Sequence, residues 1–170
     1  MELLTTPERV KSNTRPISGH ILDTKIAIYI DESEQIDIKP RLGDALFLDV
    51  KRYPEKYETL LNGGEYKDNR GTEKSFKGLI AALNYFTYAR LVKNNDLNVS
   101  SFANVYKETD YSSRVEHKEK VAAYNDAFTV ADMYLQDCLR YLNDNVDKFP
   151  LYEGKGKMKA NRVIYRVIGE

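Results

Sequence analysis

The residue types that carry most enzyme and metal chemistry are sparse in this chain. Cys138 is the only cysteine, and the two histidines, His20 and His117, lie far apart in sequence and outside any His-Glu-x-x-His pattern. No serine lies in a Gly-x-Ser-x-Gly nucleophile elbow. The Gly-Lys-Gly-Lys run at residues 154–157 lacks the spacing of a phosphate-binding loop and is typical of a basic linker. These patterns predict no metal, no cofactor and no catalytic centre.

Acidic side chains are plentiful, but none is set in an apolar run that would raise its pKa for acid or base catalysis. Several lie near the far end of the segment 21–38, where we expect an ordinary solvated face. They are Asp31, Glu32, Glu34 and Asp37. An enzyme with an unrecognised site is therefore the least favoured of three functional hypotheses.

Charge is distributed unevenly along the chain, although its 26 basic and 26 acidic residues balance. Between Glu108 and Asp147, nine acidic and four basic residues give a net charge of −5, and from residue 154 onward five basic residues and one acidic residue give +4. The basic residues of this tail are Lys155, Lys157, Lys159, Arg162 and Arg166. Opposite patches suit head-to-tail contact between identical subunits. The alternative is a regulatory module whose tail binds nucleic acid, with weak and salt-sensitive affinity.

A helix at residues 77–95 is the element around which the other segments are expected to pack. Its apolar residues occupy most sides of the helix, so it needs cover on several sides. A membrane span is excluded because Asn84 interrupts the apolar run and Arg90 closes it well short of about 20 residues. The sequence therefore predicts a central core helix.

A second, longer helix is predicted after a capping box formed by Ser113 and Glu116. Its apolar residues recur at alternating steps of three and four, which is the spacing of a seam between helices that cross at a shallow angle. The seam consists of Val121, Tyr124, Phe128, Ala131, Leu135, Cys138 and Leu142. We expect this helix to lie along the central helix, with Cys138 as a core residue.

Upstream of the central helix the signals are weaker. Residues 1–17 show no apolar period and predict an irregular arm. Segment 21–38 alternates like a strand but also forms a helical stripe, and we favour a helix that Pro40 prevents from continuing through residue 39. Segment 42–61 predicts two short helices divided before Pro54 and ended by Asn62-Gly63-Gly64.

The remaining connections are predicted to be loops. Residues 65–71 form a polar loop, and residues 97–111 form a connector with few structural signals. Residues 143–161 read as turn-like and flexible.

The end of the chain, residues 162–168, is rich in β-branched and aromatic residues and predicts a strand. One strand face carries Val163, Tyr165 and Val167, and the other carries Ile164, Arg166 and Ile168. We expect it to dock on an edge of another chain, together with the basic tail, and the alternative is that it folds back on its own chain.

The predicted fold is therefore mainly α: a small helical bundle around the central and long helices, with an irregular N-terminal arm and a C-terminal docking strand. The expected division is an arm at 1–20, a helical domain at 21–145 and an extension at 146–170. The chain's 170 residues are enough for one domain with a core.

The order of several segments goes further than composition. LLNGGEY, GLIAALNYFTYARL, SSFANVYKETDYSS and YLQDCLRYLND, which begin at residues 60, 78, 100 and 134, together resemble the head-to-tail connector, or adaptor, proteins of tailed bacteriophages. The likeness is greatest to those of phages and prophages of gut Bacteroidetes, including the crAss-like group. It covers about residues 20–145, and Ala103 departs from it where a glycine is expected.

This resemblance implies a small helical protomer in a dodecameric ring beneath the portal protein, made in the cytoplasm of a host bacterium and located at the head-to-tail junction of the virion. Such a ring extends the DNA channel and offers a platform to tail or other ring proteins. The implied contact with packaged DNA is non-specific, and no membrane is involved.

Overall fold

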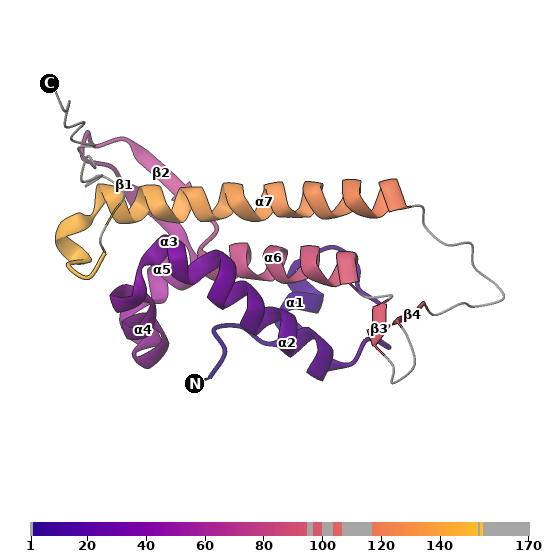
Figure 1. Ribbon diagram of the computed structural model, residues 1–170. Coiled ribbons are helices and arrows are strands. Elements are labelled where there is room, and N and C mark those ends of the chain that lie inside the picture. Colours follow the sequence, from indigo (N-terminus) through magenta and orange to yellow (C-terminus); the bar gives the residue numbers. More distant parts are fainter. Residues whose placement is uncertain (1, 95–96, 100–103, 107–116, 153, 155–170) are drawn as a thin grey trace, which may run out of the picture.

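The computed structural model describes residues 2–94, 97–99, 104–106, 117–152 and 154. Figure 1 shows three layers of helices: α7 (His117–Asp144) on one side, α6 (Leu79–Asn94) in the middle, and α1 (Pro7–Asn13) with α2 (Asp23–Ser33) on the other. The predicted helical bundle around a central helix and a long helix is confirmed.

Helix α6 is the central helix because it packs against α1, α2, α5 and α7. Its buried residues occupy several sides of the helix, as the sequence predicts: Leu79, Ala82, Leu83, Asn84, Phe86, Thr87, Ala89 and Leu91. The most extensive of these contacts is with α7, which lies beside α6 in the opposite direction.

The seam of α7 is confirmed over its second half, where Ala131, Leu135, Cys138 and Leu142 are buried. Earlier in the helix Phe128 is half-buried but packs against the core, with its ring centroid 5.1 Å from that of Phe86 on α6. Val121 is 42% exposed, so the predicted seam is wrong at that residue. The Nζ of Lys93, near the end of α6, lies over the ring of Tyr124. Val121 lies about one turn earlier on α7, past the end of the helix that would cover it.

The N-terminal segment was predicted to be irregular, and this is wrong for Pro7–Asn13, which form the helix α1. The hydroxyl of Thr6 accepts a hydrogen bond from the Arg9 N–H, and Pro7 occupies the first turn, where its missing N–H costs nothing. Val10 is fully buried. A helix of seven residues is too short to show an apolar period, so only the cap and the proline could have indicated it.

The helix predicted in segment 21–38 is confirmed as α2, but it does not stop before Pro40. It continues through a π-turn, η1 (Glu34–Ile38), into α3 (Lys39–Leu42). In this turn the Lys39 N–H donates to the Glu34 carbonyl, five residues back. The wider turn accommodates Pro40, which lies in the first turn of α3 where it needs no hydrogen-bond partner.

Two short helical pieces follow, divided before Pro54 as predicted: α4 (Asp44–Arg52), then η2 (Pro54–Tyr57) running into α5 (Glu58–Asn62). Their buried residues are Leu46, Phe47, Val50, Tyr57, Leu60 and Leu61. Gly63 ends α5 with a φ of 81°, in the left-handed region that glycine tolerates.

The predicted polar loop at 65–71 is wrong, because β1 (Gly64–Lys67) pairs antiparallel with β2 (Glu73–Phe76). The Asp68 carboxylate accepts hydrogen bonds from the backbone N–H groups of Arg70 and Thr72 and so shapes the turn. Within the connector, β3 (Leu97–Val99) pairs with β4 (Asn104–Tyr106). The capping box before α7 lies outside the described residues.

The chain after α7 folds back onto the bundle, which corrects the expected flexible segment over its described part. A short turn, η3 (Val146–Lys148), brings Phe149 and Tyr152 into the core. The centroid of the Phe149 ring lies 5.5 Å from the ring centroid of Tyr141 and 6.1 Å from that of Tyr57. No helix in these described ranges is long and apolar enough to cross a bilayer.

Candidate functional site

The residues predicted to bind partners lie outside the described part of the chain. They are Lys155, Lys157, Lys159, Arg162, Val163, Ile164, Tyr165, Arg166, Val167 and Ile168. Their roles and the strand they include therefore stay predictions.

The residues that sequence analysis considered for metal or nucleophile chemistry do not converge. His20 is exposed in the loop before α2, whereas His117 begins α7. Cys138 is buried, and this burial raises the pKa of its thiol to about 12, so it carries no thiolate near neutral pH. Among the described residues no group of three or more histidine, cysteine or acidic side chains could hold a metal ion.

Two of the carboxylates expected on a solvated face are instead withdrawn from water. The Glu34 side chain is fully buried, where it pairs with the Lys51 ammonium group and accepts a hydrogen bond of 2.6 Å from the Leu4 N–H. The expectation was wrong because the π-turn directs Glu34 towards the core, and neither an apolar run nor a spacing motif indicates that turn.

Asp37, the second of these carboxylates, links the π-turn to α6. Its carboxylate lies 2.7 Å from a guanidinium nitrogen of Arg90, whose Nε donates to the Ser33 hydroxyl at 3.2 Å. Burial raises the pKa of Asp37 and outweighs the opposite effect of Arg90. Both ion pairs connect helices within the bundle, and we assign them a structural role.

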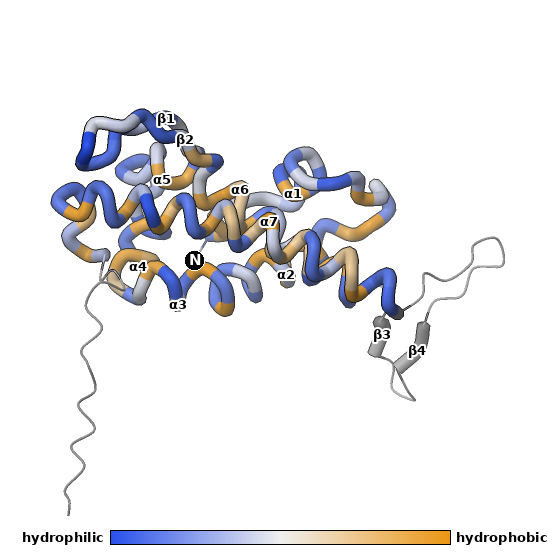
Figure 2. Tube along the Cα trace, turned by 90° about the horizontal axis from the view of Figure 1, so that it is seen from above, coloured by the Kyte–Doolittle hydropathy of each residue, from blue (hydrophilic) through white to orange (hydrophobic). Residues whose placement is uncertain are grey.

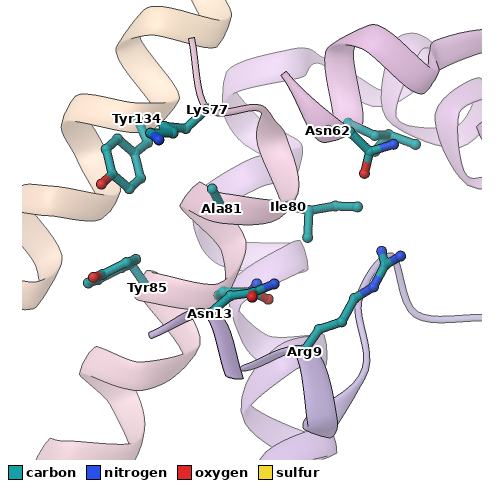
Figure 3. A pocket seen from close by; sticks show the side chains of 10 residues that line it. Arg9, Asn13, Asn62, Lys77, Ile80, Ala81, Tyr85 and Tyr134 are labelled. Atoms are coloured by element: carbon teal, nitrogen blue, oxygen red, sulfur yellow. The ribbon is translucent and has the colours of Figure 1, made fainter. Parts of the chain in front are cut away.

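An open cleft of about 500 Å³ lies where α1, α5, α6 and α7 meet (Figure 3). The sequence contains no compact motif for it, because its walls come from four separate segments. The lining residues are Arg9, Asn13, Leu61, Asn62, Lys77, Ile80, Ala81, Asn84, Tyr85 and Tyr134.

The cleft has two unlike walls. Arg9 from α1 and Asn62 from the end of α5 point towards each other across the opening, while Ile80 lies between them on α6. On the other side the rings of Tyr85 and Tyr134 meet edge to face, with centroids 5.7 Å apart and planes at 86°. Lys77 lies beside Tyr134 (Figure 3), so a ligand in this cleft would contact Arg9 and Asn62 on one side and the tyrosine rings with Lys77 on the other.

Asn84 adds a buried amide to the cleft wall. Its side chain is fully buried, and its Oδ1 accepts a hydrogen bond of 2.8 Å from the Thr5 hydroxyl. Its Nδ2 has no hydrogen-bond partner among the described residues. The lining contains two cations, Arg9 and Lys77, and no carboxylate, so the cleft suits an acidic group beside an apolar one.

A family model described as "Family of unknown function (DUF6712)" matches residues 38–162. The chain belongs to the DUF6712 family. In this DUF6712 protein the match covers α3 through α7 and includes most of the residues that line the cleft. Helix α1, which supplies Arg9 and Asn13, precedes the matched region. Searches of curated proteins and of solved structures found no match.

Proposed function

We propose that this protein is a structural protein of a tailed-phage virion: a connector that forms a dodecameric ring beneath the portal protein, extends the DNA channel and joins it to tail components. The order of four sequence segments that resemble such connectors supports the proposal. The proposed role involves no catalysis and no cofactor. DNA passes through the channel close to the protein and is not recognised specifically.

The observation that carries the proposal is that three of the four segments, 60–66, 78–91 and 134–144, meet in space. A Cβ on Gly78 would lie 2.3 Å from the Gly63 nitrogen, so the first two segments touch backbone to backbone. The ring of Tyr66 lies 5.0 Å from that of Tyr141, and its hydroxyl donates to Asp144 at 3.1 Å. The resemblance therefore concerns one packed unit of structure and not three unrelated stretches.

The ring itself is testable by mass. We expect the full chain, mixed with the portal protein encoded by the same phage genome, to form a complex of defined mass with one connector copy per portal subunit. Native mass spectrometry or light scattering measures it. A chain that remains monomeric or dimeric beside an intact portal ring would overturn the proposal.

We propose further that the basic tail and the strand at 162–168 contact the portal or a neighbouring subunit. Deleting residues 162–170 should leave the helical circular dichroism signal intact and abolish the portal complex. An unfolded truncation would show instead that the strand belongs to the core of its own chain.

The second candidate, a regulatory module, is favoured only by the net charge of +4 on the tail. Fluorescence anisotropy with a labelled DNA duplex separates the two functions. The regulatory role would be supported by two results together. The free chain would bind the duplex, and changing Lys155, Lys157 and Lys159 to glutamate would abolish that binding. The chain would also form no complex with the portal.

A further inference from the structure

A stripe of apolar and acidic residues, all exposed except the half-buried Glu32, runs along α2 and the π-turn after it. Ile28 is 60% exposed and Ile36 59% exposed, and they lie two turns apart with two carboxylates between them. We name this stripe the ridge. It consists of Ile28, Asp31, Glu32, Gln35 and Ile36. Ile26 and Ile30 are fully buried, so the ridge faces away from the core.

The ridge and the cleft lie on opposite faces of the protein. Figure 2 shows α1 and α5, which supply one wall of the cleft, on one side of α6 and α7, with α2 and α3 on the other side. Along α6, Asn84 lines the cleft, whereas Arg90 lies on the α2 side, where it binds Ser33. A protomer therefore cannot fill its own cleft with its own ridge.

The two surfaces are complementary in charge and in apolar character. The cleft carries Arg9 and Lys77 without a carboxylate, and the ridge carries Asp31 and Glu32 without a cation. The isoleucines of the ridge match the Ile80 and tyrosine surface of the cleft. A convex helix face also suits a concave opening between helices.

We propose that the ridge of one copy docks in the cleft of the next copy, with a ridge carboxylate against Arg9 and the ridge isoleucines against the apolar wall. Because the two surfaces differ and lie on opposite faces, the contact is head-to-tail, and its repetition gives a ring where the rotation between neighbours is a whole fraction of a turn, as the proposed connector requires. The inference rests on the proposed connector ring and names the lateral contact that holds it together.

Charge reversal tests the polar half of this contact in the full chain. Arg9→Glu and Glu32→Arg should each weaken self-association, measured by analytical ultracentrifugation and by copies bound per portal, by about tenfold or more. The double variant Arg9→Glu with Glu32→Arg restores opposite charges and should recover much of the association. Arg70→Glu in the hairpin turn and Glu55→Arg in η2 are exposed controls that should have little effect.

The apolar half is tested with a matched pair of exposed residues. Ile28→Gln should weaken association by about tenfold, because the ridge isoleucine is buried only in the contact. Met133→Gln on α7, which is 62% exposed compared with 60% for Ile28, is the control and should leave association unchanged. Circular dichroism and urea unfolding confirm that each variant is folded.

The outcomes separate this inference from the proposed function. If rings form on the portal but the ridge and cleft variants behave like their controls, the lateral contact is elsewhere and the connector role stands. If both single reversals weaken association and the double variant does not recover, the proposed pairing is wrong. Closed two-subunit dimers would overturn the head-to-tail arrangement, and no assembly under any condition would overturn both proposals.

Discussion

Lys51 on α4 directs its ammonium group onto the buried carboxylate of Glu34 in the π-turn. The two side chains are only 3% and 0% exposed, and the same carboxylate accepts the Leu4 N–H. One carboxylate thus joins the N-terminal segment, the end of α2 and α4. Because both charges have left water, neither partner can be removed without leaving the other uncompensated.

Lys51→Met is therefore expected to lower the free energy of unfolding by about 3 to 5 kcal/mol, since Glu34 would remain buried without a counter-ion. Urea unfolding at neutral pH measures the loss. The double variant Glu34→Gln with Lys51→Met should recover a large part of it. Lys56→Met removes an exposed partner of Asp49 and should cost far less; equal losses for Lys51 and Lys56 would contradict the prediction.

Asp37 is expected to give the protein an unusual pH dependence. Its folded-state pKa is raised above the ordinary value of 3.8 by burial, so the folded protein holds this proton more tightly than the unfolded chain. The resulting contribution to stability is complete below pH 3.8 and is lost as pH rises through the raised pKa.

The comparison of wild type with Asp37→Asn isolates this contribution. As pH rises from the acidic range towards neutrality, the free energy of unfolding of the wild type should fall relative to that of Asp37→Asn. Urea unfolding at a series of pH values measures the difference. If the wild type instead gains stability relative to the variant over this range, the Arg90 pair outweighs burial and the prediction is wrong.

Gly78→Ala is expected to be among the most destabilising single substitutions. The φ of Gly78 is +86°, and a Cβ there would lie 2.3 Å from the Gly63 nitrogen and 2.4 Å from the Asn62 carbonyl carbon. Backbone strain and overpacking each cost about 1 to 3 kcal/mol. Gly19→Ala meets nothing within 4 Å and serves as the control in the same thermal unfolding assay. A Gly78→Ala protein as stable as the control would refute the close approach.

The α7 seam predicts a contrast between its two halves. Leu135 is 1% exposed and Val121 is 42% exposed. Leu135→Ala should therefore cost about 2 to 5 kcal/mol as a cavity in the core, whereas Val121→Ala should cost less than about 1 kcal/mol. Urea unfolding of both variants tests the contrast, and similar losses would mean that Val121 is covered by another part of the protein.

Helices α2, α6 and α7 could be predicted because they are long enough to show an apolar period. The shorter α4 and α5 could be predicted from the apolar residues on either side of Pro54 and from the Asn62-Gly63-Gly64 stop. Seven-residue α1 and the four-residue strands of the β1–β2 hairpin are too short for such a signal, and the hairpin turn from Asp68 to Thr72 lacks the usual Asn-Gly pair. Their positions follow from long-range contacts such as Thr5 with Asn84.

The cleft and the buried carboxylates were harder to predict for a related reason. Arg9, Asn62 and Tyr134 meet only after folding, so their spacing in sequence carries no information about the cleft. The burial of Glu34 depends on a π-turn, which is set by one backbone hydrogen bond and by the need to accommodate Pro40. The tail and its strand lie outside the described residues, and their predicted roles stay predictions.

Helix α7 has a mechanical consequence that follows from its length. Its 28 residues span about 42 Å, whereas the 16 residues of α6 span about 24 Å. It ends beside the β1–β2 hairpin (Figure 1), where the Asp144 carboxylate accepts a hydrogen bond from the Tyr66 hydroxyl and pairs with the Lys74 ammonium group. Helix α7 thus spans the protein from one end to the other, and a tilt imposed at one end of the helix becomes a displacement at the other. In the proposed ring, a partner that engages one rim would therefore shift the height of the opposite rim.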